Sequence, residues 1–421
     1  MNSNSVAPQF VLKDNYNIKT VNSITLSNGI DCFYLRAGDQ ELVRLELHFD
    51  VGANAQTKAM QSFFAAKMLP EGTSNKSSSQ IAEIVAFHGA YLEIVPGNEK
   101  TIITLYVLNK HIDPMVDLLL EIIGSPSFQQ EDLDRVKQQR LQNLEVSYEK
   151  TSFLASRLYK QKLFGDHYYA RMATKEFIET TQVEDLKLYF ENNLKNKPFK
   201  VYVSGEVTEE ILSKIDAKFS KLHFDAIAFE ANEKTAFESE KGVFRLNKEG
   251  AMQASIVFGF PVMSKDHPDF CKFSFVNEVF GGYFGSRLMS NIREEKGFTY
   301  GIGSYISHYK YASFLQVSTD VKTEHADDTV NEIHKEMRLL QNEPTSADEL
   351  EKVKNYLIGS FASSLNTPFD LMDKFKSIDF YGLDYSFYTH YISEVKNITA
   401  SDVMEMANKY FSNDPTVVVC G

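Results

Sequence analysis

Cysteine is scarce in this sequence, and its few residues lie far apart. Cys32, Cys271 and Cys420 are odd in number and show no Cys-x-x-Cys spacing. The sequence therefore indicates neither a disulfide framework nor a thiolate metal site. Proline is also infrequent, with 11 residues, and glycine supplies 21 of the 421 positions. These proportions exclude a collagen-like or low-complexity chain and are typical of a globular protein.

Long hydrophobic runs and an excess of positive charge are absent as well. No stretch approaches the ~20 apolar residues that span a bilayer, and residues 1–8 lack the basic and apolar segments of a signal peptide. We therefore expect a cytoplasmic protein without a membrane span, or a periplasmic one if a leader was removed. Lys and Arg number 44 against 57 Asp and Glu, a net charge of −13. A groove that follows phosphates is not expected, so nucleic acid is not a predicted partner.

Paired metal-binding histidines are missing too. None of the ten histidines belongs to a His-x-x-Glu-His or His-Glu-x-x-His motif. His88, His111 and His167 have no second histidine one helical turn away, so we expect capping, surface or loop residues. A metal site built from His88, Glu93 or Glu145 would have no spacing to support it.

A clear alternation of apolar and polar residues predicts a strand at residues 43–51. His48 lies on its polar face together with Arg44, Glu46 and Asp50, and we expect this face to be solvated. The residues expected to point inward are Val43, Leu45, Leu47 and Phe49.

The second half of the chain repeats motifs of the first half in the same order. Glu131–Lys137 is echoed by Asp348–Lys354 at an offset of 217, and Gly205 by Gly421 at an offset of 216. Thr180–Phe190 is likewise echoed by residues 399–410. Such an offset indicates tandem duplication of a unit of ~210 residues rather than a short solenoid repeat.

Each repeated unit mixes strands and helices. In the first unit, hairpin signals near residues 24–35 and strands near 90–108 alternate with helical stretches, the longest from Gln130 to about Lys160. We therefore predict an α+β fold with two tandem homologous domains, each a mainly antiparallel sheet flanked by helices. The predicted boundaries are 1–224 for the first domain, 225–241 for a linker rich in Glu, Ala and Lys, and 242–421 for the second domain.

A glycine-punctuated stretch in the second unit carries the most specific pattern. A helix is predicted over residues 286–296, Gly297 sits where a left-handed C-terminal cap belongs, and a strand follows. Alternation places Phe298, Tyr300 and Ile302 on one face of that strand. Arg293 and Tyr300 are seven residues apart, and a tight glycine turn could bring both onto one surface. Such a donor pair suits a carbonyl oxygen or a developing oxyanion, although a solvated Arg and a half-buried Tyr explain the local sequence equally.

The two units, the stretch 286–305 and the run Lys67–Thr73 together resemble the pitrilysin/insulinase zinc peptidases, peptidase family M16. The similarity is to the short-chain branch, which includes mitochondrial processing peptidase and bacterial paired subunits, and it covers residues 20–421. This resemblance implies the LuxS/MPP-like metallohydrolase fold. It also implies that Arg293 and Tyr300 correspond to an Arg/Tyr pair that, in the family's active enzymes, faces the zinc of a partner domain.

The zinc motif that the resemblance leads one to expect is absent. Active members carry His-x-x-Glu-His in the first domain, where two His bind zinc and the Glu activates water. Aligned on Met68-Leu69, the five positions are Phe63, Phe64, Ala65, Ala66 and Lys67. The family's third ligand is a Glu, and Glu145 falls close to its place. We expect no metal in this chain, and zinc in a partner subunit.

The resemblance therefore favours a non-catalytic subunit of a heterodimeric zinc peptidase. Such a subunit is not a peptidase by itself. It would bind peptide or unfolded protein through Arg293 and Tyr300 opposite an active partner that carries His-x-x-Glu-His, and homodimers are also possible. The alternative is a purely structural family member, comparable to the core proteins of respiratory complexes, without a proteolytic role.

Overall fold

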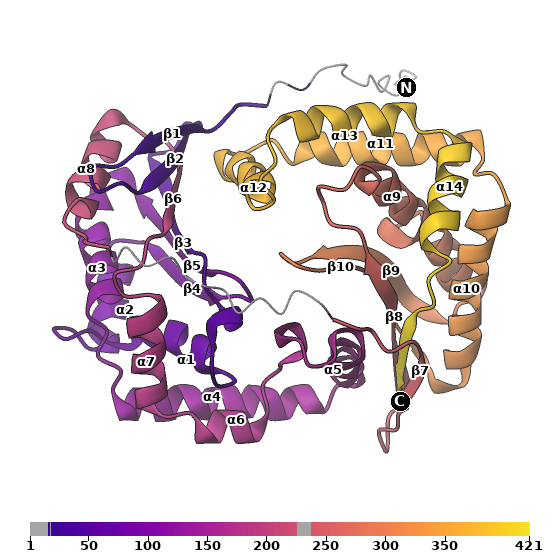
Figure 1. Cartoon of the computed structure of the whole chain (residues 1–421), viewed down its shortest axis with the longest axis horizontal. Helices are drawn as coiled ribbons and strands as arrows, with labels where there is room; N and C mark the ends of the chain where they lie inside the picture. Colours follow the sequence, from indigo (N-terminus) through magenta and orange to yellow (C-terminus); the bar gives the residue numbers. More distant parts are fainter. Residues whose placement is uncertain (1–15, 17, 225–236) are drawn as a thin grey trace, which may run out of the picture.

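The computed structural model describes residue 16 and residues 18–224 and 237–421. The strands of these segments form two separate sheets, with helices around both (Figure 1). Most strand pairs are antiparallel, and only the β2–β6 and β7–β11 pairs among the described strands are parallel. The predicted α+β class with two tandem units is confirmed. Residues 225–236 of the predicted linker lie outside the described residues.

The first sheet has the strand order β1-β2-β6-β3-β5-β4. Its hairpin β1–β2 turns at Gly29, whose φ of +87° favours glycine, as the Asn-Gly signal predicts. The strands are β1 (Asn22–Thr25), β2 (Asp31–Arg36), β3 (Leu42–Phe49), β4 (Tyr91–Pro96), β5 (Thr101–Leu108) and β6 (Lys200–Gly205). The helices of the first unit are α1 (Gln61–Met68), α2 (Ser78–Phe87), α3 (Ile112–Gly124), α4 (Gln130–Tyr148), α5 (Thr151–Phe164), α6 (Lys175–Thr180), α7 (Val183–Asn193) and α8 (Glu209–Phe219).

The second sheet repeats this arrangement. Its order, β7-β11-β8-β10-β9, matches the order β2-β6-β3-β5-β4 of the first sheet, so the duplication visible in the sequence is also one of topology. The strands are β7 (Gly242–Leu246), β8 (Gln253–Val262), β9 (Thr299–His308), β10 (Ser313–Lys322) and β11 (Thr416–Cys420). The helices are α9 (Phe270–Asn277), α10 (Ala326–Asn342), α11 (Ala347–Ser363), α12 (Pro368–Asp379), α13 (Ser386–Asn397) and α14 (Ala400–Tyr410).

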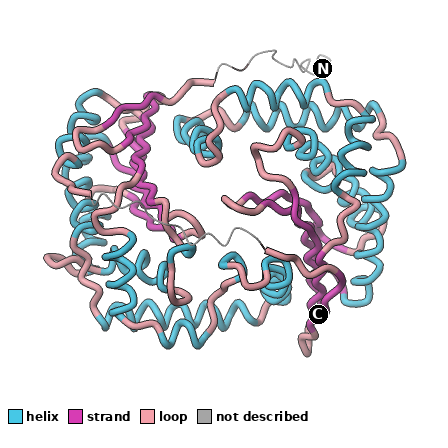
Figure 2. Tube along the Cα trace, in the orientation of Figure 1, coloured by secondary structure: helices cyan, strands magenta, loops and turns pink. Residues whose placement is uncertain are grey.

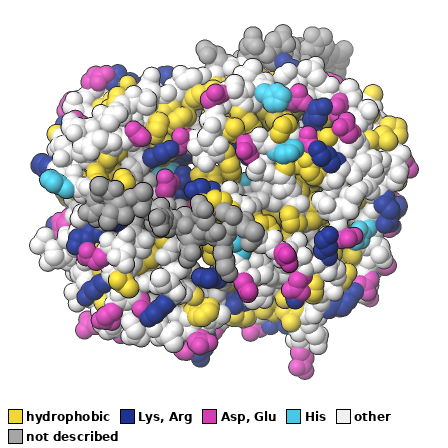
Figure 3. All heavy atoms as spheres, in the orientation of Figure 1, with side chains coloured by type: hydrophobic (Ala, Val, Ile, Leu, Met, Phe, Trp, Pro, Cys, Tyr) yellow, Lys and Arg dark blue, Asp and Glu magenta, His cyan; other side chains and the backbone are white. Residues whose placement is uncertain are grey.

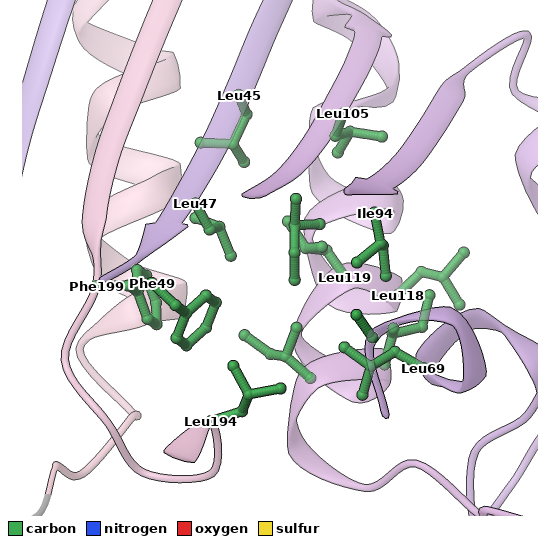
Figure 4. Packing of buried hydrophobic residues seen from close by; sticks show 14 of the residues in the cluster. Leu45, Leu47, Phe49, Leu69, Ile94, Leu105, Leu118, Leu119, Leu194 and Phe199 are labelled. Atoms are coloured by element: carbon green, nitrogen blue, oxygen red, sulfur yellow. The ribbon is translucent and has the colours of Figure 1, made fainter. Parts of the chain in front are cut away.

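Each sheet has its own core on the face that its own helices cover. In the first unit, the inward residues of β3 point toward Leu118 and Leu119 of α3 (Figure 4). Each such leucine contributes ~1.5–3 kcal/mol when it is fully buried. The alternation predicted for β3 is confirmed, because its four apolar residues are all buried. These residues are Val43, Leu45, Leu47 and Phe49.

The opposite face of each sheet is covered by a helix from the other unit. Helix α5 packs on β8 and β11 of the second sheet, and α12 packs on β2 and β6 of the first. Figure 1 shows the two helices between the sheets, α12 beside the first and α5 beside the second. Figure 2 places the two sheets apart on opposite sides of the molecule. The helices begin at equivalent positions, Thr151 and Pro368, at the offset of 217 found in the sequence.

This exchange of helices corrects two expectations. The long helix predicted from Gln130 to about Lys160 is two helices, because Lys150 adopts an extended conformation that redirects α5 onto the second sheet. The polar face of β3 is not solvated. Arg44, Glu46 and His48 are 5%, 4% and 5% exposed, because α12 covers them.

The face of the molecule shown in Figure 3 carries side chains of both charges. On the face shown in Figure 3, acidic and basic side chains are interspersed among apolar ones. None of the helices in the described parts of the chain combines the length and hydrophobicity that crossing a bilayer requires.

Candidate functional site

Helix α1 carries the residues that stand in for the zinc motif. Ala66 is fully buried, and Phe63 is partly buried against the first core. The Lys67 ammonium donates a hydrogen bond of 2.9 Å to the carbonyl of Ile94 on β4. The side chain at the place of a metal ligand is thus used to tie α1 to the edge strand of the sheet.

The surroundings of α1 do not fit a zinc ion. The Arg140 guanidinium of α4 lies 4.9 Å from the centre of the Phe63 ring, so a positive charge already occupies this neighbourhood. Phe63, Ala66 and Lys67 offer no oxygen, nitrogen or sulfur lone pair suited to zinc at neutral pH. Among the described residues, no group of three or more His, Cys, Asp or Glu side chains could hold a metal.

The carboxylate nearest to the family's third ligand position also points elsewhere. Leu144 is buried in the first core, whereas Glu145 is exposed. Leu144 lines the same pocket as Phe63 and Arg140. Apolar and cationic groups therefore replace the ligands on both helices that face this pocket.

The Arg/Tyr stretch folds largely as predicted, with one difference in the helix. Gly297 has a φ of +65°, as the predicted left-handed cap requires. The predicted helix 286–296 is α-helical only at residues 287–288 and continues as a π-helical segment, Met289–Glu295. The amide of Lys296 accordingly bonds to the carbonyl of Asn291, five residues back. π-helical turns are rare in proteins, and those that occur are often found at functional sites.

A β-bulge in β9 sets the direction of Tyr300. Ile302 pairs with Thr319 and Thr299 pairs with Val321, so Tyr300 and Gly301 oppose one residue of β10. The simple alternation that placed Tyr300 on the same face as Ile302 is therefore wrong. Ile302 is buried, whereas Tyr300 is 95% exposed. Bulges commonly re-aim a side chain next to a functional site.

The structure brings Arg293 and Tyr300 together. The Arg293 Nε donates a hydrogen bond of 3.1 Å to the Tyr300 backbone carbonyl. Its guanidinium also lies 4.8 Å from the centre of the Phe284 ring and 3.5 Å, at Nη1, from Glu294 Oε1. These contacts fix the plane of the guanidinium and leave Nη2 for another acceptor. The sequence indicated the pair but not Phe284, whose exposed ring supports it.

The Tyr300 side chain borders a large hollow between the two units. The hollow has a volume of about 1310 Å³ and is lined by Lys150 and Thr151 at the start of α5 and by Met252 before β8. The Tyr300 hydroxyl has no hydrogen-bond partner among the described residues. A phenol and a guanidinium on an open surface can together donate to an oxygen acceptor on a bound molecule.

The other histidines do not combine into a site. The rings of His88 and His111 lie 4.7 Å apart between their centres, tilted by 59°, near the end of α2. No carboxylate or cysteine completes a metal-binding set around them in the described part of the chain. His167 caps a short turn by accepting a hydrogen bond from the Tyr169 amide at 3.2 Å. Their predicted capping, surface or loop positions agree with the geometry.

Comparison with known proteins matches both units to one family. The model described as insulinase (peptidase family M16) matches residues 35–173, and the model described as peptidase M16 inactive domain matches residues 180–357. The chain is 27% identical to the non-peptidase homolog YmxG of Helicobacter pylori, over 84% of this chain and 82% of that protein. It is 22% identical to an uncharacterized zinc protease, YmxG, of Bacillus subtilis, over 93% and 95%.

Solved structures agree with this assignment. A peptidase M16 inactive domain from Pseudomonas fluorescens superimposes with a TM-score of 0.82 at 23% identity, covering 95% of this chain and 98% of that one. A protease from Helicobacter pylori superimposes with a TM-score of 0.84 at 17% identity, covering 96% and 99%. With both family models in place on the duplicated fold, the chain belongs to peptidase family M16, and other residues stand at the positions of its zinc motif on α1.

Proposed function

We propose that this chain is the non-catalytic, substrate-binding subunit of a two-chain zinc peptidase. The proposal rests on a difference between two sites, the zinc-motif positions on α1 and the Arg293/Tyr300 pair. Helix α1 has lost every zinc ligand, whereas Arg293 and Tyr300 remain in contact, with the Tyr300 side chain exposed on edge strand β9. A purely structural role would not require an exposed phenol on the residue whose backbone carbonyl binds the Arg293 guanidinium.

In this proposal, Arg293 and Tyr300 donate hydrogen bonds to the scissile carbonyl as its oxygen gains charge. The partner subunit carries the His-x-x-Glu-His motif and the zinc. Because Phe284, Glu294 and the Tyr300 carbonyl hold the Arg293 guanidinium, this donor needs little reorganisation when the substrate arrives. Removing one donor of this kind typically costs ~10²–10³ in turnover.

The edge strands of both sheets suit peptide binding. Strand β4 ends the first sheet and β9 ends the second, so each presents backbone groups to which an extended peptide can add, although the Ile94 carbonyl of β4 already accepts a hydrogen bond from Lys67. The hollow beside Tyr300 is large enough to receive such a segment.

The test is reconstitution with a candidate subunit that carries His-x-x-Glu-His. Peptide cleavage is expected to require this chain, and Arg293→Ala and Tyr300→Phe are expected to lower kcat/KM by ~10²-fold or more. Tyr356→Phe is a matched control, because Tyr356 is also exposed but lies on α11. Cleavage that is unchanged in Arg293→Ala and Tyr300→Phe would contradict the proposal. Stable association without cleavage in any pairing would support the structural alternative.

A further inference from the structure

A pocket of about 470 Å³ opens beside the residues that replace the zinc motif. It is lined by the start of α1, the end of β4, the inner side of α4 and the loop that follows α5. One wall is apolar. Its apolar side chains are Met60, Phe63, Leu144, Phe153 and Met172.

The charged side chains of the pocket are three arginines, with no carboxylate among them. Arg140, Arg157 and Arg171 line it, and its lining contains no Asp or Glu. None of the three makes an ion pair with any residue that the structure describes. This is unusual in a chain of net charge −13, where other arginines such as Arg135 and Arg287 bind carboxylates.

Two of these arginines are held in place by uncharged groups. The Arg157 Nη1 donates a hydrogen bond of 2.7 Å to the Ala173 carbonyl, and the Arg140 guanidinium lies over the Phe63 ring. The Arg140 Nε is buried and has no hydrogen-bond partner among the described residues. Burial also lowers the pKa of Arg140, since no anion offsets the loss of water. Arg140 and Arg157 are partly buried, whereas Arg171 is exposed. A partly buried charge without an anionic partner is costly, and an anion bound here would relieve that cost.

The pocket lies at one end of an edge strand. Pro96, the last residue of β4, lines it together with Gly97 and Asn98. Strand β4 pairs only with β5 among the described strands. An extended peptide that adds parallel to β4 along its free edge would therefore bring its C-terminus to this pocket.

We propose that this pocket binds the C-terminal residue of a peptide. The three arginines hold the terminal carboxylate, and the apolar wall receives the last side chain. The inference rests on the proposed function in that it supplies the substrate class: peptides with a free C-terminus and an apolar last residue. Guanidinium groups suit it because their fork geometry matches a carboxylate.

The test measures binding of acetyl-Ala-Ala-Ala-Leu to the full chain by calorimetry, as the free acid and as the C-terminal amide. The free acid is expected to bind about tenfold or more tightly than the amide, and Arg140→Gln and Arg171→Gln to remove that preference. Arg140→Lys should retain part of it. Arg338→Gln, on the exposed face of α10, is the matched control and should leave it unchanged. Equal binding of acid and amide would overturn the proposal, as would a preference that survives Arg140→Gln.

Two further measurements are needed. One identifies the source of the carboxylate, and the other distinguishes failure of this inference from failure of the proposed function. If N-acetyl-leucine binds as tightly as the peptide, the ligand is a small free carboxylate and the peptide assignment is wrong; binding at least tenfold weaker supports the assignment. The acid preference should persist in Arg293→Ala, because Arg293 lies outside this pocket. One combined outcome is that the free acid binds more tightly than the amide while Arg293→Ala leaves cleavage by the reconstituted complex unchanged. In that case the proposed function fails and the pocket assignment stands.

Discussion

Arg44 on β3 forms a two-point ion pair with Asp373 on α12. Nη2 lies 2.8 Å from Oδ1 and Nη1 lies 3.2 Å from Oδ2. Beside them, the Lys376 ammonium contacts both oxygens of Glu46 at 2.8 and 2.7 Å. These pairs join residues more than 300 positions apart and hold α12 of the second unit on the first sheet.

Lys376→Met should destabilise the protein. It removes one of the two cations beside the buried Glu46 carboxylate, while the Arg44 Nε stays 3.1 Å from Oε2. The loss should therefore fall below the ~3–5 kcal/mol that a fully unpaired buried charge costs. Denaturant unfolding measures the change in the free energy of unfolding. Lys352→Met is the control, because the Lys352 side chain is 66% exposed and forms a surface salt bridge with Asp348. Such a salt bridge stabilises the fold by at most ~1 kcal/mol. Equal small losses in both variants would show that the contact with α12 contributes little.

The stability of the protein should fall with pH on the acidic side of neutrality because of His308. Burial, with a smaller effect of Lys265, lowers the pKa of His308 from 6.5 to about 4. The unfolded chain therefore takes up the proton first, so stability is complete above pH 6.5 and declines down to pH 4. At ~1.4 kcal/mol per pH unit the decline is at most about 3 kcal/mol. The measurement is the free energy of unfolding at several pH values.

His308→Gln provides the comparison for that pH series. Gln can keep a hydrogen bond to Ser313, whose hydroxyl lies 2.7 Å from the His308 Nδ1, but it cannot titrate. The variant should unfold with a shallower pH dependence between pH 6.5 and 4. An unchanged slope would assign the dependence to other groups.

Tyr159→Phe should stabilise the protein. Tyr159 of α5 is fully buried against the second sheet, and its hydroxyl has no hydrogen-bond partner in the described part of the chain. Removing an unsatisfied buried hydroxyl is expected to gain ~1 kcal/mol. Tyr202→Phe is the contrasting variant, because the Tyr202 hydroxyl donates to Asp379 at 2.9 Å. It should lose ~1.5–3 kcal/mol, and a thermal unfolding series distinguishes the two signs.

The two units should not fold well as separate fragments. A fragment of residues 1–224 would expose the side of α5 that carries Tyr159 and Leu163, which packs on Val418 and Cys420 of the second sheet. A fragment of residues 242–421 would expose α12 in the same way. Each fragment should therefore aggregate when expressed alone, and the two should purify together when co-expressed. A stable monomeric fragment in gel filtration would contradict this expectation.

The parts of the fold set by local pattern were predictable from the sequence. Alternation identified the inward residues of β3, and the repeated motifs revealed the duplication. The burial of His48 was not predictable, because the helix that covers it lies more than 300 residues further along the chain. The break between α4 and α5 was missed because neither Gly nor Pro marks Lys150.

The residues of the candidate site were predictable from the sequence, but the direction of the Tyr300 side chain was not. The spacing of Arg293 and Tyr300 around Gly297 indicated a shared surface, and the two residues do make contact. The bulge that turns Tyr300 outward had one signal, Gly301 within a strand pattern. The arginine pocket had none, because Arg140, Arg157 and Arg171 come together only after α1, α4 and α5 have packed.

The exchange of α5 and α12 has a consequence for symmetry. The two helices occupy equivalent positions in the repeat, and each covers the sheet of the opposite unit. The contact is therefore reciprocal, like the interface of a two-fold dimer in which each subunit lends the same element to the other. One repeat alone would leave a sheet face uncovered and a helix without its surface. At least two repeats are therefore needed for every sheet face to be covered, and here both repeats belong to one polypeptide.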